Sequence, residues 1–266
     1  MFWEKDIETI DRDQLHKLQL ERLQTTVESA SRSSCYRKLF KRKGIFPEDI
    51  KTLEDLAKLP LTTKDDLREE WPYGFLAVSK DEIVRMHSSS GTTGRATVIF
   101  HTRKDIDSWT DQLARCMYMS GMRKSDVFQN MMTYALFTGG LGFHYGAECL
   151  GALVIPAGPG NSKRQIQLMQ DFDTTAIHII PSYALHLTTV FEEAGIDPRK
   201  DTRLRMAFIG AEPHSEKMRK RIEDFYGVKA FNSYGLSEMS GPGVAFECPE
   251  QDGLHIWEDA YIVEII

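Results

Sequence analysis

Short apolar runs that alternate with helix-like segments restrict the fold of this chain more than any other feature of its sequence. The runs occupy residues 83–86, 97–100, 127–131, 152–155, 176–180, 206–209 and 229–232, and helical spacing is seen over 104–119, 161–171, 183–194 and 214–226. Strands that alternate with helices form a mostly parallel sheet that is covered by helices on both faces. The sequence therefore predicts an α/β fold.

The residues before this alternation have a different pattern. Residues 13–43 carry apolar side chains every three to five positions among charged ones, which is typical of one long amphipathic helix. Thr52 and Thr63 each stand three residues before a carboxylate, as in a capping box at a helix start. We therefore expect a mostly helical N-terminal segment over 1–82, followed by the α/β part over 83–266.

Composition and charge exclude several classes of protein. The 266 residues carry a formal net charge of −6 with no long basic run, which argues against nucleic acid as a partner. No apolar stretch is long enough to span a membrane and the N-terminus lacks a signal-peptide pattern, so we expect a cytoplasmic protein with no membrane partner. The cysteines are far apart and form no Cys-x-x-Cys pair, which indicates reduced thiols.

A loop rich in hydroxyls and glycine lies between the first two predicted strands. It consists of Ser88, Ser89, Ser90, Gly91, Thr92, Thr93 and Gly94. Glycine lets backbone N–H groups turn toward an anion, and hydroxyls add further donors, so the composition predicts a phosphate-binding loop. The Walker pattern is absent because no Gly-Lys-Ser/Thr follows at its spacing. A polar hairpin turn without a ligand is the alternative.

A second motif, Ser233-Tyr234-Gly235-Leu236-Ser237-Glu238, follows the predicted strand 229–232. The Tyr234 ring can stack on a base, and the Glu238 carboxylate can bind magnesium. Residues 133–134, 181–182 and 210–213 also follow predicted strands. Ligands of open α/β sheets bind outside the carboxyl ends of the strands, so we expect a site for a flat ligand at this edge.

Together these two motifs resemble those of the adenylate-forming superfamily, which includes acyl-CoA synthetases, peptide-synthetase adenylation domains and luciferase. Three further strings are similar to phenylacetate-CoA ligases: residues 134–148, Gly-Ala-Glu-Pro at 210–213, and residues 253–259. The resemblance covers nearly the whole chain. It departs from the superfamily at Thr97, where a lysine usually ends the phosphate loop.

The resemblance implies an enzyme that uses ATP and magnesium to convert an aryl acid such as phenylacetate into an acyl adenylate, and then transfers the acyl group to coenzyme A. It implies that residues 88–94 bind the β- and γ-phosphates and that Glu238 holds magnesium. Glu238 and Thr92 would be the catalytic residues. The remaining residues of the implied ATP site are Ala211, Glu212, Pro213, Ser233, Tyr234 and Gly235. A homodimer that acts in phenylacetate catabolism is implied as well.

Aromatic walls with small floor residues suit a flat aryl acid, and on this ground we expect an acid pocket formed by Tyr134, Phe137, Gly142, Ala211 and Gly235. Alternatively, Tyr134 and Phe137 are core residues that cover the sheet. His144 either touches the carboxylate, closes the pocket or is structural. His178, inside an apolar run, is expected to be a core histidine.

The spacing of Cys248 and His255 can supply half of a tetrahedral zinc site. Two ligands do not complete such a site. The alternative is a buried thiol and an unrelated surface imidazole.

The family pattern continues past residue 266 with an aspartate that binds the ribose, a hinge and a small C-terminal domain with a lysine that contacts the acyl phosphate. The resemblance therefore implies that this chain is the large N-terminal domain of the enzyme, incomplete at its C-terminal end. One alternative is a module that binds ATP or an aryl acid without catalysis. Another is an adenylating enzyme that serves a carrier-protein thiol.

Overall fold

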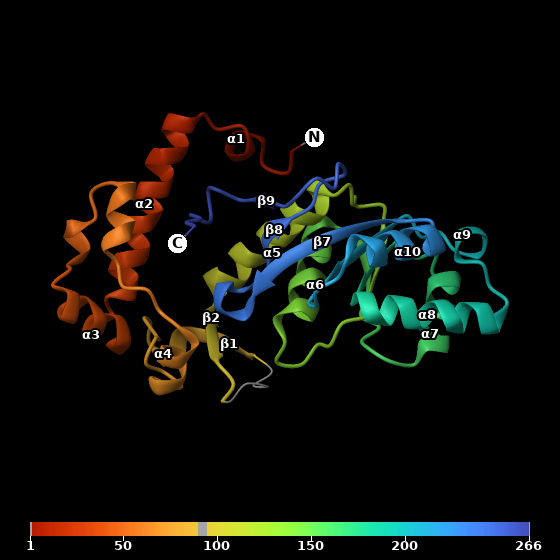
Figure 1. Cartoon of the computed structure of the whole chain (residues 1–266), viewed down its shortest axis with the longest axis horizontal. Coiled ribbons are helices and arrows are strands. Elements are labelled where there is room, and N and C mark those ends of the chain that lie inside the picture. Colours follow the sequence, from red (N-terminus) through yellow and green to blue (C-terminus); the bar gives the residue numbers. More distant parts are fainter. Residues whose placement is uncertain (1, 90–94, 266) are drawn as a thin grey trace. The chain divides into compact units, whose positions relative to one another are not determined.

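The computed structural model describes residues 2–89 and 95–265, which form two compact units. Unit 1 comprises residues 1–3 and 107–256, and unit 2 comprises residues 4–106 and 257–266. Figure 1 shows their elements, coloured along the sequence. The sequence pattern predicts a boundary at residue 82. In the structure, the hairpin that follows this residue belongs to the same unit as the N-terminal helices.

Unit 2 begins with helices. Its helical elements are α1 (Lys5–Glu8), α2 (Arg12–Ala30), α3 (Ser34–Lys43), η1 (Pro47–Asp49), η2 (Leu53–Lys58), α4 (Lys64–Glu69) and η3 (Lys80–Glu82). The prediction of one helix over 13–43 is wrong, because α2 ends at Ala30 and α3 starts afresh at Ser34. The Ser33 hydroxyl accepts the Tyr36 N–H and caps the new helix.

The two predicted capping boxes are both present in unit 2. The Thr63 hydroxyl accepts the Asp66 N–H, and the Asp66 carboxylate accepts the Thr63 N–H at 2.7 Å, which starts α4. The Thr52 N–H donates to Asp55, but the helix that follows is 3-10 rather than α. Strands β1 (Ile83–Ser88) and β2 (Val98–Thr102) then pair antiparallel.

Unit 1 is built on a seven-stranded sheet with the order β4-β3-β5-β6-β7-β8-β9. Its strands are β3 (Val127–Asn130), β4 (Leu153–Ile155), β5 (Ala176–Ile179), β6 (Met206–Gly210), β7 (Lys229–Leu236), β8 (Gly241–Phe246) and β9 (His255–Ile256). Pairing is parallel from β4 to β7 and antiparallel at β8 and β9. The predicted mostly parallel α/β fold is confirmed.

Helices connect these strands and cover the sheet. They are α5 (Arg103–Met119), which begins in unit 2, α6 (Thr138–Leu150), α7 (Ser162–Asp171), α8 (Pro181–Ala194), α9 (Pro198–Asp201), α10 (Glu216–Tyr226) and η4 (Ser237–Met239). The four helical stretches predicted after residue 100 match α5, α7, α8 and α10. Helices α7, α8 and α10 pack side by side (Figure 1). Among the described residues, no helix is long and apolar enough to cross a membrane.

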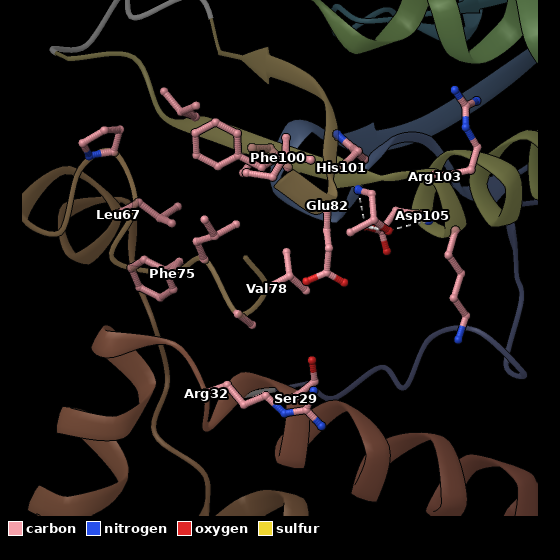
Figure 2. Close-up of a pocket in the computed structure, with 18 residues that line it drawn as sticks. Ser29, Arg32, Leu67, Phe75, Val78, Glu82, Phe100, His101, Arg103 and Asp105 are labelled. Carbon is pink, nitrogen blue, oxygen red and sulfur yellow. Dashed lines mark hydrogen bonds between the residues drawn. The ribbon is translucent and has the colours of Figure 1, made fainter. Parts of the chain in front are cut away.

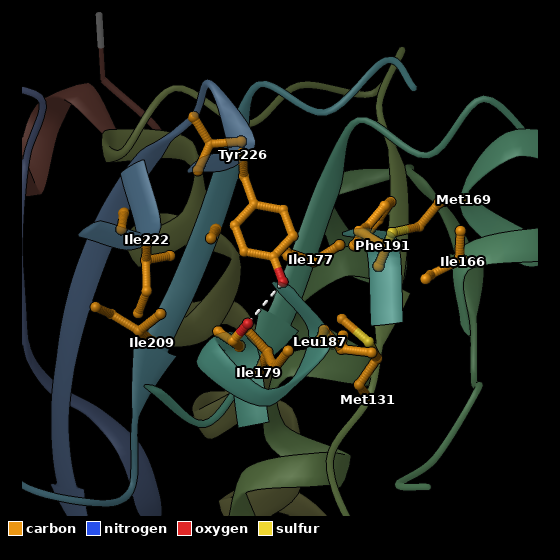
Figure 3. Close-up of a cluster of buried hydrophobic side chains, with 14 residues drawn as sticks. Met131, Ile166, Met169, Ile177, Ile179, Leu187, Phe191, Ile209, Ile222 and Tyr226 are labelled. Carbon is orange, nitrogen blue, oxygen red and sulfur yellow. Dashed lines mark hydrogen bonds between the residues drawn. The ribbon is translucent and has the colours of Figure 1, made fainter. Parts of the chain in front are cut away.

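The core of unit 1 lies on both faces of the sheet. Ile177, Ile179, Ala207 and Ile209 belong to a buried cluster with side chains of α7, α8 and α10 (Figure 3). The alternate residues His178 and Phe208 contact the Phe143 ring of α6, at centroid distances of 3.7 and 5.5 Å. Successive side chains of a strand point to opposite faces of the sheet. Strands with buried side chains at every position therefore contribute to the core on both faces.

Candidate functional site

The hydroxyl-rich loop joins β1 to β2 in unit 2, as the sequence predicts. Ser88 ends β1 and Ser89 follows it. The Ser89 N–H donates to the Thr97 carbonyl at 3.0 Å, and the Ser89 hydroxyl accepts the Thr97 N–H at 3.0 Å and its O–H at 3.1 Å. These bonds close the base of the loop. The remaining predicted members, Ser90, Gly91, Thr92, Thr93 and Gly94, lie outside the described residues.

The far end of this loop is anchored by Arg95, which sequence analysis did not include in the site. Its guanidinium stacks over the Trp71 ring at 3.5 Å from the centroid. Its carbonyl accepts a bond from Arg68 Nε at 3.4 Å. A cation therefore stands beside the predicted phosphate loop, and the basic residue directly after Gly94 was the available signal.

At the carboxyl edge of the sheet in unit 1, β6 ends in a turn with a strained residue. Ala211 has φ +65°, a region that costs a residue with a Cβ about 1–2 kcal/mol. The preceding Gly210 pairs with Ser233, and a Cβ at Gly210 would lie 2.9 Å from the Ser233 carbonyl oxygen. Close strand approach and backbone strain at a strand end are features of ligand sites.

Glu212, predicted to lie on the adenine wall, links this turn to α8. Its carboxylate accepts the Ser182 N–H, and the Ser182 hydroxyl donates to it at 3.0 Å. Ser182 is the second residue of α8, where the positive end of the helix dipole favours a carboxylate. Glu212 therefore holds the turn in place, and Ala211 and Pro213 beside it are exposed.

Ser233, Tyr234 and Gly235 lie within β7 rather than after it, so the predicted strand end at Asn232 is wrong. The strand continues because it pairs with β8, where Tyr234 faces Ala245 and Gly235 faces Pro242 across a bulge. A Cβ at Gly235 would lie 2.0 Å from the Gly241 carbonyl oxygen, so only glycine fits. Tyr234 is 53% exposed, and its ring is available for stacking.

Glu238 is the middle residue of the 3-10 turn η4, which follows β7, and it is half-buried. A carboxylate is a ligand that magnesium prefers. In residues 2–89 and 95–265, no group of three or more His, Cys, Asp or Glu side chains is arranged to hold a metal ion. Cys248 is half-buried between β8 and β9, and His255 is exposed on β9. The zinc hypothesis for this pair is not supported.

Tyr134, from the segment between β3 and α6, makes a hydrogen bond to α6. Its hydroxyl lies 3.2 Å from His144 Nδ1, with the two rings nearly perpendicular. His144 Nε2 lies 3.1 Å from Glu148 Oε1. Burial raises the pKa of the Tyr134 hydroxyl, which keeps it protonated. Sequence analysis gave possible roles to Tyr134 and His144 but none to Glu148, for which the i, i+4 spacing from His144 was the signal.

The other predicted acid-pocket residues differ in their surroundings. Phe137 precedes α6 and is 37% exposed, so it is not a core residue. Gly142 is buried, and a Cβ there would lie 2.4 Å from the Trp109 ring. Gly142 thus allows α6 to pack closely on α5, and its predicted contact with an acid stays a prediction.

Asn130, at the carboxyl end of β3, is a buried residue that sequence analysis missed. Its Nδ2 donates to the Gly140 carbonyl at 2.7 Å, and its Oδ1 accepts the Met132 N–H at 3.2 Å. Oδ1 also lies 3.1 Å from Nδ1 of His178, which is buried as predicted. Burial lowers the pKa of His178 to about 3. A polar residue at the end of an apolar run was the signal for Asn130.

Unit 2 contains a cavity of about 870 Å³ between α2 and the β1–β2 hairpin, seen in Figure 2. Apolar side chains such as Leu67, Phe75 and Phe100 form its walls, with Arg32 and Arg103 among the charged residues. The wall residues that the structure describes include none of the predicted site residues.

Comparison with known proteins agrees with this architecture. The sequence model for AMP-binding enzymes matches residues 18–259. The chain is 47% identical over 262 residues to phenylacetate-coenzyme A ligase of Pseudomonas putida, covering 98% of this chain and 60% of the relative. The corresponding ligase of Escherichia coli K12 is 45% identical, with 98% and 60% coverage.

A solved structure is similar as well. The open conformation of 2-hydroxyisobutyryl-CoA ligase in complex with 2-HIB-AMP and CoA superimposes with a TM-score of 0.90 and 31% identity, over 97% of this chain and 62% of that one. The present chain spans about 60% of the length of the curated relatives it matches. On the extent of these matches, the chain belongs to the family of AMP-binding enzymes.

Proposed function

We propose that this chain is the N-terminal part of an aryl acid:CoA ligase of the phenylacetate-CoA ligase type. The enzyme would convert a phenylacetate-like acid to an acyl adenylate with ATP and then transfer the acyl group to coenzyme A. The observation that carries this proposal is the 47% identity, over 98% of the chain, to the Pseudomonas putida ligase. The acyl-AMP and CoA named for the 2-hydroxyisobutyryl-CoA ligase structure support the two-step order.

In the first step, a carboxylate oxygen of the acid attacks the α-phosphorus of ATP and pyrophosphate leaves. Catalysis of such a step depends on positioning and on stabilising the charge that develops. Residues 88–94 would bind the outer phosphates with N–H and hydroxyl donors, above the base that Ser89 and Thr97 close. Thr92 and Glu238 would be the catalytic residues.

The adenine would lie at the carboxyl edge of the sheet in unit 1. The exposed Tyr234 ring offers a stacking surface, and the Ala211–Pro213 turn is held in place by the Glu212–Ser182 bonds. Glu238 would hold magnesium, which supplies positive charge to the phosphates when bound. The enzyme would work as a cytoplasmic homodimer in phenylacetate catabolism.

The acid would bind against Tyr134 and Phe137, over the small residues Ala211 and Gly235, with Gly142 behind them. The half-buried Tyr134 and the partly exposed Phe137 provide apolar ring surface and one polar group. This mixture suits a flat, apolar acid with a single carboxylate.

The test is calorimetric titration of the chain with ATP and magnesium, with and without phenylacetate, followed by a pyrophosphate-release assay. The assay is repeated after addition of the remaining C-terminal part of a phenylacetate-CoA ligase. We expect binding of both ligands, and pyrophosphate release once the added part is present. Binding without release in either assay would favour a non-catalytic binding module. Binding of neither ligand would refute the proposal.

A further inference from the structure

Tyr134, His144 and Glu148 lie next to one another in unit 1, with a hydrogen bond on one side of the imidazole and an ion-pair contact on the other. The Tyr134 hydroxyl and His144 Nδ1 are 3.2 Å apart, and His144 Nε2 and Glu148 Oε1 are 3.1 Å apart. The His144 side chain is 19% exposed and that of Glu148 is 53% exposed, so the chain runs from a partly buried hydroxyl to a solvated carboxylate. Both ring nitrogens of His144 are therefore engaged.

The partners of His144 determine where its proton lies without a ligand. An ionised carboxylate can only accept, so the Glu148 oxygen that lies 3.1 Å from Nε2 favours the tautomer of His144 with its proton on Nε2. In a neutral imidazole the other nitrogen is then an acceptor, and the Tyr134 hydroxyl donates to Nδ1. Without a ligand, the Tyr134 hydroxyl proton thus points at His144 and is not available to a substrate.

A carboxylate substrate changes this arrangement, because it needs a donor and can accept a hydrogen bond from the Tyr134 hydroxyl in place of His144 Nδ1. The Tyr134 oxygen and His144 Nδ1 would then face each other with lone pairs only. A proton on Nδ1 restores the bond, with His144 now donating to the Tyr134 oxygen. The imidazolium would then donate to the Tyr134 oxygen and lie 3.1 Å from the Glu148 carboxylate.

We propose that His144 is the positioning residue for Tyr134 in the acid site, and that binding of an aryl carboxylate is coupled to uptake of one proton at His144 Nδ1. The proton comes from solvent and one N–H bond forms. This inference rests on the proposed function, in which Tyr134 contacts the acid. Burial supports it, because the raised pKa of the Tyr134 hydroxyl keeps that group a donor.

Few other titratable groups face His144. On α6 these are Glu148 and Tyr145, whose ring lies 5.4 Å from the imidazole. Strands β3, β4 and β8, which pack on α6, contain no acidic or basic residue. Helix α5 packs Trp109 and Leu113 against α6, and its Asp111 accepts a bond from Trp3.

Titration calorimetry with phenylacetate, in buffers of different ionisation enthalpy, measures the proton uptake. We expect uptake close to one proton per acid bound. His144→Gln keeps a donor and an acceptor but cannot be protonated, so the acid should bind with uptake near zero. The control His16→Gln, on an exposed residue of α2, should keep the full uptake. Equal heats in all buffers for the unmodified chain would overturn the inference.

Nitrogen-15 NMR of the imidazole tests the same inference without relying on acid binding. The ligand-free chain should show His144 as the Nε2–H tautomer, and Glu148→Gln should lower that preference. An Nδ1–H tautomer would overturn the inference even if phenylacetate binds. Absence of phenylacetate binding would instead count against the proposed function, and the tautomer would still decide whether the Glu148–His144–Tyr134 chain exists.

Discussion

Replacing Gly235 by alanine should separate β7 from β8 at the predicted nucleotide site. The added Cβ would lie 2.0 Å from the Gly241 carbonyl oxygen and 2.6 Å from the Pro242 Cα. Since real Cβ contacts below 3.0 Å essentially do not occur, the two backbones must move apart by at least 1.0 Å (3.0 − 2.0). Overpacking of this kind costs about 1–3 kcal/mol.

The same movement strains a second contact, because the Pro242 carbonyl accepts a bond from Trp109 Nε1 at 2.9 Å. Loss of that bond adds about 1 kcal/mol. We therefore expect Gly235→Ala to lower the free energy of unfolding of unit 1 by about 2–4 kcal/mol. Binding of ATP with magnesium should weaken too, since Tyr234 and Glu238 lie on either side of Gly235.

Urea unfolding, followed by a signal from unit 1, measures this loss. Gly195→Ala, also in unit 1, is the matched control, since nothing lies within 4 Å of its added Cβ and only its φ of +67° opposes the substitution. The control should cost about 1–2 kcal/mol and leave ATP binding unchanged. A Gly235→Ala variant within about 0.5 kcal/mol of the unmodified chain would refute the reasoning.

Three further outcomes are expected. Glu238→Gln should weaken ATP binding in the presence of magnesium and change it little without the metal, as calorimetry can measure; equal affinities under both conditions would remove Glu238 from the metal site. Tyr134→Ala, placed in a full-length enzyme, should raise KM for the acid much more than KM for ATP, and the reverse pattern would remove it from the acid pocket. The buried His178, whose pKa is lowered to about 3, binds a proton more readily in the unfolded chain, so stability should fall as pH drops from about 6.5 toward 3. Urea titrations at several pH values should show a smaller decrease for His178→Gln, and an unchanged pH slope would contradict the assignment.

Much of the fold could be predicted because it depends on local patterns. In the apolar runs 176–180 and 206–209, residues 176–179 and 206–209 are buried, which is typical of strands in a sheet that is covered on both faces. The helices between them show the 3.6-residue period, and the caps at Thr52 and Thr63 use contacts only three residues apart. The break between α2 and α3 was missed because the apolar period continues across it. The structure shows that the Ser33 hydroxyl caps the start of a new helix there.

The edge of the sheet was decided by partners far along the chain. Strand β8 contains two glycines and a proline, which oppose strand formation in isolation. Pairing with β8 is also what extends β7 through Tyr234 and Gly235. Local propensity could predict neither, because the hydrogen bonds that stabilise these strands come from residues outside any short window.

In the candidate site too, some features follow from the sequence and others from the tertiary structure. The sequence by itself determined the residue types: hydroxyls and glycines at 88–94, aromatic rings at Tyr134 and Tyr234, and a carboxylate at Glu238. Only the tertiary structure decided that Glu212 binds Ser182 and that His144 joins Tyr134 to Glu148. The physical reason is that hydrogen bonding depends on distances of about 3 Å, which the packing of α6 and α8 on the sheet establishes.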